Sequence, residues 1–314
     1  MRPVLYVVVP CYNEQEVLPE TSKRLKAKMT ALMESGRIDE KSRMMLVNDG
    51  SRDRTWTMIE ELHESDPLFA GVKLSRNRGH QNALLAGLMT AKEDADVTIS
   101  MDADLQDDID AIDRFLDEFE KGNDVVYGVR SERKTDTAFK RMTAEGFYKL
   151  MKALGVDTVF NHADYRLLSR RALEGLAGYR EVNLFLRGMV PLVGYKSSTV
   201  MYERHERFAG ESKYPFKKML ALALDGITSL SVKPIRLILG LGVIIFLFSL
   251  VMLLYALISK WTGHADTGWT SILASIWMIG GIQLLCLGVI GEYIGKIYSE
   301  TKQRPRYIIE KILK

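Results

Sequence analysis

The chain has 314 residues, 47% of them hydrophobic and 26% charged, so it is long enough to bury a full core and to exceed one domain. Its formal net charge of +3 is too balanced for a nucleic-acid binder, and no basic patch interleaved with aromatic residues appears. The two cysteines, Cys11 and Cys286, lie in segments of unlike character, which argues against a disulfide framework and favours a reducing compartment.

The first half of the chain alternates between predicted strands and predicted helices. Residues 4–9 form a near-continuous apolar run, which is typical of a strand covered on both faces. Further strands are predicted at residues 44–47, 72–74, 96–99 and 125–129, and helices at 16–35, at 55–63 and in a segment ending at 91. This alternation predicts an α/β fold with a parallel, doubly wound sheet. Ligands bind at the carboxyl ends of the strands in such sheets, so the polar loops after the strands are expected to converge on one crevice.

Two acidic residues follow the fourth predicted strand, within the stretch Ser-Met-Asp-Ala-Asp-Leu-Gln-Asp at residues 100–107. Residues i and i+2 of an extended backbone point to the same side, so Asp102 and Asp104 can aim at one point. Two carboxylates repel each other unless a cation or donors lie between them, and Mg²⁺ is often held by one or two carboxylates plus substrate phosphates. A solvated acidic turn is the alternative, because so short a motif occurs often by chance.

The middle of the chain has fewer clear elements. A basic segment at 130–141 follows the fifth predicted strand, and an amphipathic helix is predicted to run to about residue 154. A further helical stretch is predicted at 185–193. His80 and His205 lack a second His or Cys at ligand spacing, so neither is interpreted as a metal ligand.

The last hundred residues have the pattern of a membrane protein. An apolar stripe at helical spacing begins after Pro215 and predicts either a core helix or an interfacial helix, and its place before the next element favours the interface. Residues 237–258 and 269–291 carry no charge, and each is long enough to span a bilayer core, which needs ~20 helical residues. Lysines and arginines flank both runs on their outer sides, whereas the link at 259–268 holds only Lys260, so both termini are expected to be cytoplasmic. The stripe residues are Phe216, Met219, Leu220, Ala223, Leu224, Ile227 and Leu230.

Six motifs in order, together with the two apolar runs, resemble family-two glycosyltransferases of the GT-A fold. More narrowly, the chain is similar to the bacterial polyprenyl-phosphate glycosyltransferases, such as bactoprenol glucosyltransferases, which are relatives of dolichol-phosphate mannose synthase. The motifs are Val-Val-Pro-Cys-Tyr-Asn-Glu at 8–14, Val-Asn-Asp-Gly-Ser at 47–51, Arg-Asn-Arg-Gly at 76–79, Asp-Ala-Asp-Leu-Gln-Asp at 102–107, Asp-Tyr-Arg-Leu at 164–167 and Arg-Phe-Ala-Gly-Glu-Ser-Lys-Tyr at 207–214. The resemblance covers nearly the whole chain. Tyr165 departs mildly from it, because the family commonly has Phe there.

The resemblance implies three regions and a set of site residues. A cytoplasmic GT-A catalytic domain would occupy residues 1–214, a juxtamembrane amphipathic helix 215–234, and a two-helix transmembrane region with a basic cytoplasmic tail 235–314. The nucleotide-sugar donor would contact Pro10, Tyr12, Glu14, Asp49, Arg76, Gly79, Asp102 and Ala103. Asp102 and Asp104 would hold Mg²⁺ or Mn²⁺ against the diphosphate, and Asp104 and Asp164 would be the catalytic residues. Arg130, Arg133, Arg166, Arg207 and Lys213 would bind the acceptor phosphate.

Two of these roles have structural alternatives. Asp49 could instead shape its own Asn-Asp-Gly-Ser turn. Asp164 could be a structural partner of Arg166, because buried charges are generally paired. A lipid phosphate, with a second pKa near ~6, is already anionic at neutral pH and hardly needs a strong base, so Asp164 could be a base or an orienting group.

The resemblance implies inverting, metal-dependent transfer of one sugar, with UDP-glucose as the favoured donor, to undecaprenyl phosphate at the cytoplasmic face of the inner membrane. GDP-mannose, UDP-GlcNAc and an aminoarabinose donor are alternatives, as is a non-catalytic membrane module that binds the lipid carrier. The expected partners are the nucleotide sugar, the polyprenyl phosphate, the bilayer and further copies of the chain, with a tetramer implied by the resemblance. Nucleic acid is not expected as a partner.

Overall fold

The computed structural model describes residues 2–131, 162–203, 228, 231–261 and 268–314. These residues divide into two compact units, one comprising 2–131, 162–203 and 304–314, and the other comprising the described residues from 228 to 303. All residues of the predicted juxtamembrane stripe lie outside the described residues. Arg133, Arg207 and Lys213 also lie outside them, as does His205.

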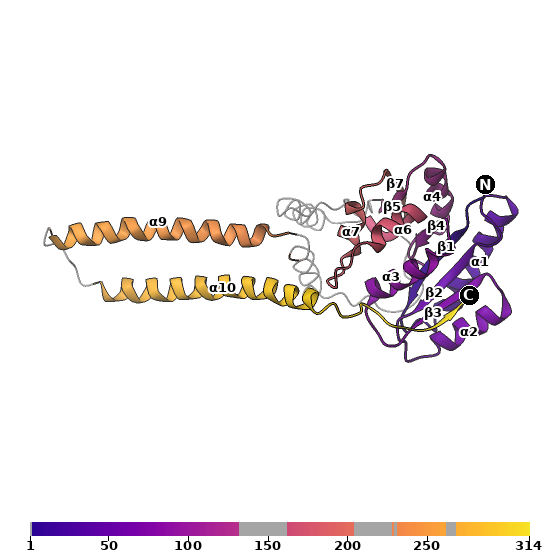
Figure 1. Cartoon of the computed structure of the whole chain (residues 1–314), viewed down its shortest axis with the longest axis horizontal. Coiled ribbons are helices and arrows are strands. Elements are labelled where there is room, and N and C mark those ends of the chain that lie inside the picture. Colours follow the sequence, from indigo (N-terminus) through magenta and orange to yellow (C-terminus); the bar gives the residue numbers. More distant parts are fainter. Residues whose placement is uncertain (1, 132–161, 204–227, 229–230, 262–267) are drawn as a thin grey trace. The chain divides into compact units, whose positions relative to one another are not determined.

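The first unit contains a mixed, mostly parallel sheet of eight described strands in the order β7-β5-β6-β4-β1-β2-β3-β8 (Figure 1). Parallel pairing joins β1 to β2 and β4, β2 to β3, and β5 to β7, whereas β6 and β8 run antiparallel to their neighbours. The strands are β1 (Leu5–Cys11), β2 (Arg43–Asn48), β3 (Phe69–Leu74), β4 (Val97–Ser100), β5 (Val125–Arg130), β6 (His162–Ser169), β7 (Ser197–Tyr202) and β8 (Ile309–Leu313). The predicted α/β class is therefore confirmed, with two antiparallel strands added.

Helices cover both faces of this sheet. Along β1 the side chains alternate, so that Leu5, Val7 and Val9 pack in the core beneath α1, α2 and α4, whereas Tyr6 and Val8 pack with α3, α6 and α7. All seven residues of β1 are buried, which confirms the prediction of a strand covered on both faces. These helices are α1 (Leu18–Glu34), α2 (Thr55–Ser65), α3 (His80–Ala91), α4 (Ala111–Glu120), α6 (Arg170–Ala177) and α7 (Leu186–Leu192).

The close contact between α3 and the sheet depends on Gly87. A Cβ atom at this position would lie 2.4 Å from Cγ1 of Val8 and 2.6 Å from Cγ2 of Val47. Both neighbours are buried side chains of central strands, so a larger residue would push the helix away from the sheet. Because α3 begins at the ends of the central strands, its position matters for the site described below.

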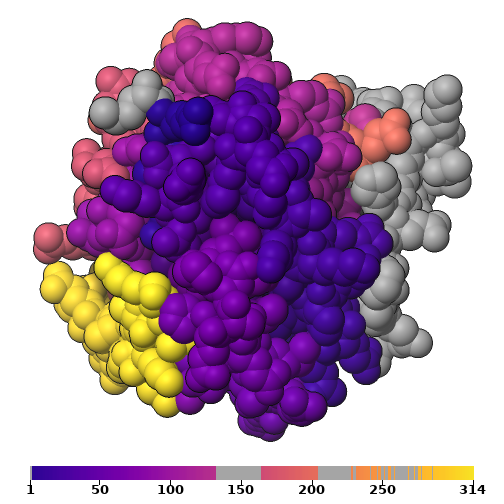
Figure 2. All heavy atoms as spheres, turned by 90° about the vertical axis from the view of Figure 1, so that its right-hand side faces the viewer, coloured from indigo at the N-terminus to yellow at the C-terminus, as the bar shows by residue number. Residues whose placement is uncertain are grey.

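The C-terminal residues differ from the prediction of a basic cytoplasmic tail. Strand β8 pairs antiparallel with β3, and Figure 2 shows the C-terminal residues, in yellow, lying against purple residues of the first third of the chain. Two ion pairs cross this edge, Lys73–Glu310 at 2.7 Å and Lys311–Glu60 at 2.8 Å. Residues 304–314 therefore belong to the first unit.

The second unit contains two long helices that contact each other, α9 (Lys233–Trp261) and α10 (Trp269–Thr301). In the described part of the chain, one helical segment is long and apolar enough to cross a membrane, Met278–Thr301, with a mean hydropathy of 1.5. The segment overlaps the predicted span at 269–291. The predicted span at 237–258 is not confirmed by this criterion.

Candidate active site

The polar residues of the motifs gather at the sheet edge where the parallel strands end. Strands β1, β2, β4 and β5 all end at this edge, and β6, which runs antiparallel, begins there. The register of β4 and β6 ends with Ser100 opposite Arg166. Just beyond this pair, Asp102 and Asp164 both approach Nε2 of His80, at 3.5 Å and 3.7 Å. The Ser100 hydroxyl donates to the backbone oxygen of Asp164 and fixes this alignment. The Asp-x-Asp motif and the Asp-Tyr-Arg-Leu motif, both of which the resemblance assigned to the catalytic site, thus meet through the pairing of β4 with β6.

The carboxylate of Asp164 is bound by two arginines. Nη2 of Arg166 donates to one carboxylate oxygen, and Arg187 donates through Nε at 3.2 Å and through Nη2 at 3.0 Å. Burial would raise the pKa of Asp164, but the two guanidinium groups outweigh burial and hold this pKa well below its usual range. Asp164 is therefore an ionised carboxylate at neutral pH.

Arg166 does not have the surroundings expected of an acceptor-phosphate ligand. It is 1% exposed, and besides Asp164 its guanidinium donates to the backbone oxygen of Leu186 at 3.3 Å. The predicted contact of Arg166 with a lipid phosphate therefore does not agree with its burial. Arg187, which the sequence analysis did not single out, is the partly exposed cation here, with 35% of its side chain exposed. Its only sequence signal was its place in the helix predicted at 185–193.

His80 joins this cluster from the beginning of α3. Its Nε2 atom lies 3.5 Å from Oδ1 of Asp102 and 3.7 Å from Oδ2 of Asp164. Gly79, which precedes it, has a φ of +85°, a conformation that glycine adopts at little cost. The sequence analysis interpreted His80 only as a residue that is not a metal ligand. Its signal was its position directly after the Arg-Asn-Arg-Gly motif.

Asp49 joins two loops that carry predicted donor-binding residues. Its carboxylate accepts hydrogen bonds from the backbone N–H groups of Arg78 at 2.7 Å and Gly79 at 2.9 Å. Burial raises the pKa of Asp49, and these two donors oppose the rise. The close approach of the loops also requires Gly50, because a Cβ atom there would lie 2.4 Å from the backbone nitrogen of Asn77. The carboxylate therefore holds the Arg76–Gly79 loop in place, and its predicted contact with the nucleotide stays a prediction.

The other predicted donor residues surround the same edge. Pro10 is buried in β1, and Tyr12, which follows β1, is 43% exposed. Glu14 is half-buried, and its backbone N–H donates to Oγ1 of Thr55 at 2.9 Å. Arg76 is exposed. An aromatic ring and a cation that are open to solvent at this edge are available to a ligand.

Asp102 and Asp104 suit a metal ion that binds together with the substrate better than one held by protein ligands alone. Burial raises the pKa of Asp102, and the nearby carboxylates of Asp164 and Asp104 add to this rise, against the opposing effect of His80. A cation would relieve that repulsion. In the described residues no group of three or more His, Cys, Asp or Glu side chains is placed to hold a metal. Because Mg²⁺ is commonly held by one or two carboxylates together with substrate phosphates, these two residues suit an ion that binds with a diphosphate.

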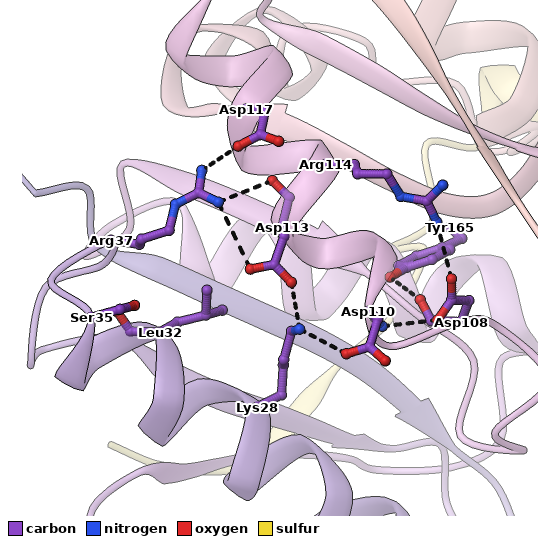
Figure 3. Close-up of polar contacts among 10 residues, drawn as sticks. All are labelled: Lys28, Leu32, Ser35, Arg37, Asp108, Asp110, Asp113, Arg114, Asp117 and Tyr165. Atoms are coloured by element: carbon purple, nitrogen blue, oxygen red, sulfur yellow. Dashed lines mark hydrogen bonds and ion pairs between the residues drawn. The ribbon is translucent and has the colours of Figure 1, made fainter.

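The loop that carries these carboxylates is tightly held. Leu105 has a φ of +58°, which is strained for a non-glycine residue and persists only where the surroundings enforce it. The Thr21 hydroxyl donates to the backbone oxygen of Ala103 at 2.7 Å. Figure 3 shows the far end of the loop, where the Tyr165 hydroxyl donates to the Asp108 backbone oxygen at 2.9 Å and Lys28 of α1 pairs with Asp110 at 2.8 Å. The structure therefore presents the carboxylates on a rigid support.

Arg130, the last residue of β5, brings a further cation to the edge. It is half-buried, its Nε donates to the Tyr202 hydroxyl at 3.2 Å, and its charge lowers the pKa of Asp102. One edge of the sheet thus holds three carboxylates and two partly exposed guanidinium groups. They belong to Asp102, Asp104, Asp164, Arg130 and Arg187. Such an arrangement can hold two anionic substrates close together.

Comparison with known proteins identifies the family. A family model, Glycosyl transferase family 2, matches residues 6–176, and a second model, GtrB C-terminal hairpin, matches residues 233–297. The uncharacterized glycosyltransferase YkoT of Bacillus subtilis (strain 168) is 53% identical over 309 residues, which cover 98% of this chain and 92% of that protein. A prophage bactoprenol glucosyl transferase homolog of Escherichia coli (strain K12) is 40% identical over 313 residues, covering 98% and 99%. The bactoprenol glucosyl transferase of Shigella phage SfII is 40% identical over 310 residues, covering 97% of both chains.

The first family model spans the α/β unit from β1 to α6 and more than half of the chain. The chain therefore belongs to glycosyl transferase family 2 and is a glycosyltransferase.

Proposed function

We propose that this enzyme transfers one sugar from a nucleotide sugar to polyprenyl phosphate at the cytoplasmic face of the membrane. The observation that carries the proposal is that Asp102 and Asp164 approach the same His80 nitrogen, while Arg187 pairs with Asp164. Carboxylates suited to a metal–diphosphate group lie beside a cation suited to a second phosphate. The names of the bactoprenol glucosyl transferase relatives support glucose as the sugar and a polyprenyl phosphate as the acceptor.

The reaction is a single displacement. An oxygen of the acceptor phosphate forms a bond to the anomeric carbon, the bond from that carbon to the donor's diphosphate oxygen breaks, and the nucleoside diphosphate leaves with the electron pair. Inversion at the anomeric carbon follows, without a covalent intermediate on the enzyme. Mg²⁺ or Mn²⁺ bound by Asp102 and Asp104 would supply Lewis-acid neutralisation of the charge on the leaving group.

In this reaction Asp164 positions groups and does not act as a base. A phosphate monoester has a second pKa near ~6, so the acceptor needs no strong base at neutral pH. The low pKa of Asp164, held down by Arg166 and Arg187 against the effect of burial, makes it a poor proton acceptor. Its carboxylate fixes the direction of Arg187, and Arg187 and Arg130 then hold the acceptor phosphate.

Membrane anchoring follows from the return of the chain to the sheet. Residues 2–131 and 162–203, which precede the helical hairpin, and residues 304–314, which follow it, belong to the same unit, in which β8 pairs with β3. The intervening chain must therefore cross a membrane an even number of times. If Met278–Thr301 spans, one further crossing is needed, and α9 is the partner that the described residues offer. Its 29 residues would extend about 44 Å, more than a ~30 Å hydrocarbon core, and Leu247, Phe248 and Val251 are each at least 56% exposed.

The test is sugar transfer by membranes that contain the overproduced enzyme. Radiolabelled UDP-glucose and undecaprenyl phosphate are supplied, and the solvent-extracted lipid is analysed by mass spectrometry, with UDP-GlcNAc and GDP-mannose assayed in parallel. We expect a hexosyl phosphate lipid from UDP-glucose, none from Asp104→Asn, and normal product from Asp94→Asn, which changes an exposed carboxylate paired with Lys314. A wild-type enzyme that labels no lipid with any of these donors would contradict the proposal.

A further inference from the structure

Tyr202 lies beside Arg130 at the ends of two neighbouring strands. The two residues are register partners in the parallel pair of β5 and β7. The backbone oxygen of Tyr202 accepts hydrogen bonds from the backbone N–H of Ser131 at 2.9 Å and from the Ser131 hydroxyl at 3.1 Å. The backbone at the end of β5 is therefore fixed to that of Tyr202.

The Tyr202 hydroxyl connects Arg130 to a buried carboxylate. It donates to Oδ1 of Asp107 at 2.6 Å and accepts from Nε of Arg130 at 3.2 Å. Asp107 is 2% exposed, and its second oxygen has no hydrogen-bond partner in the described part of the chain. Burial raises the pKa of Asp107 to about 6, and the charge of Asp102 adds to the rise. One hydroxyl thus joins the loop of the Asp-x-Asp motif to a cation of the acceptor side.

The ring of Tyr202 has little freedom to turn. It is 1% exposed and packs edge to face on Tyr165, with ring centroids 5.2 Å apart. Tyr165 in turn packs edge to face on Phe115, with ring centroids 4.7 Å apart. Its hydroxyl donates to the Asp108 backbone oxygen, as Figure 3 shows. Because both neighbouring rings are buried, the direction of the Tyr202 hydroxyl is set by packing.

We propose that Tyr202 is a positioning residue that sets the direction of the Arg130 guanidinium for the acceptor phosphate. A guanidinium is planar, so fixing Nε also fixes the plane in which its terminal N–H groups lie, and bidentate contact with phosphate depends on that plane. The inference rests on the proposed function, in which Arg130 binds the acceptor. Through Asp107 the same hydroxyl keeps Arg130 at a constant place relative to the donor-side carboxylates.

The test is steady-state kinetics of the full-length enzyme in detergent, with UDP-glucose and undecaprenyl phosphate as substrates. Tyr202→Phe keeps the ring and removes the hydroxyl. We expect the KM for the acceptor to rise about ten-fold, the scale of one lost hydrogen bond to a charged group, and the calorimetric Kd for UDP-glucose to stay within about two-fold. The matched control is Tyr179→Phe, which removes a tyrosine hydroxyl bonded to the Leu192 backbone oxygen, away from these strand ends, and should change neither constant.

A double-mutant cycle separates positioning from general destabilisation. If Tyr202 acts through Arg130, Tyr202→Phe should raise the acceptor KM no further in an Arg130→Ala background. Arg130→Lys serves in its place if the alanine variant does not fold. Independent, multiplying effects of the two substitutions would overturn the inference, as would a Tyr202→Phe variant whose donor Kd rises as much as its acceptor KM.

The outcome also separates this inference from the proposed function. An Arg130→Ala enzyme that still transfers glucose with an unchanged acceptor KM would overturn the role of Tyr202 and leave the transfer reaction standing. A wild-type enzyme that transfers no sugar would contradict the proposed function itself.

Discussion

The ion pairs of Asp164 predict that its substitution affects folding as well as catalysis. In Asp164→Asn the guanidinium of Arg166, which is 1% exposed, loses the carboxylate that balances its charge. Removing one partner of a buried ion pair typically costs ~3–5 kcal/mol, whereas the more exposed Arg187 adds ~1 kcal/mol or less. For a unit of this size, a loss of ~3 kcal/mol corresponds to a decrease in Tm of about 6–12 °C.

The assay is thermal unfolding of the purified enzyme in detergent, followed by circular dichroism, alongside transfer activity measured below the lower Tm. Asp164→Asn combined with Arg166→Met removes both charges, and replacing a buried pair by an apolar residue is often nearly neutral. We therefore expect the double variant to recover most of the lost stability. Its activity then separates the two roles of Asp164, because a stable but inactive double variant would show that the carboxylate is also needed at the site.

An Asp164→Asn variant with an unchanged Tm and no transfer would refute this reasoning. It would mean that Arg166 is not balanced by Asp164 and that the carboxylate acts in the chemistry alone. Arg187→Gln is the matched control for the exposed partner. We expect it to lower Tm by only about 2–4 °C, while raising the KM for the acceptor.

Three further outcomes are expected. The pKa of Asp107 is about 6 in the folded enzyme, above the ~3.9 of an unfolded Asp, so the stabilisation from its protonated form is lost as pH rises from about 4 to 6. Asp107→Asn should therefore stabilise the enzyme relative to the wild type at pH 7 but not at pH 4. A difference in Tm between the two proteins that does not depend on pH, measured in EDTA, would contradict this. Truncation after Gln303 removes β8 and the hydrogen bond from Arg78 to the Pro305 backbone oxygen, so Tm should fall and proteolysis should begin near β3. Removal of Lys314 alone is the control and should leave Tm nearly unchanged. Excess EDTA should stop transfer, and Mg²⁺ or Mn²⁺ should restore it; full activity in the chelator would exclude a metal at Asp104.

Local sequence determined the framework of the catalytic unit. The unbroken apolar run at β1 predicts burial on both faces, because every side chain of a central parallel strand is covered by helices. The Asp-x-Asp stretch lies where a strand ends, and the ends of parallel strands share an edge, so its place at that edge could also be predicted. The pairing of Asp164 with Arg166 was foreseeable as well, because residues i and i+2 lie on one face of a strand.

Only the tertiary structure decided which groups meet across long separations. Arg187 reaches Asp164 because the start of α7 is held at β6, where Arg166 donates to the Leu186 backbone oxygen. His80 approaches Asp102 because the start of α3 lies at the strand ends. The sequence around Arg187 or His80 predicts neither contact. Each depends on where a helix packs in the folded unit and not on the periodicity of residues within that helix.

The C-terminal strand β8 is the clearest example of an element that the local sequence does not predict. Residues 309–313 contain two charges, which is typical of an exposed tail and equally of an edge strand. Whether so short a segment forms a strand depends on a partner, and its partner β3 lies more than two hundred residues earlier in the chain. The residue types of this segment are compatible with a strand, but the hydrogen bonds that form the strand come from its partner β3 in the folded sheet.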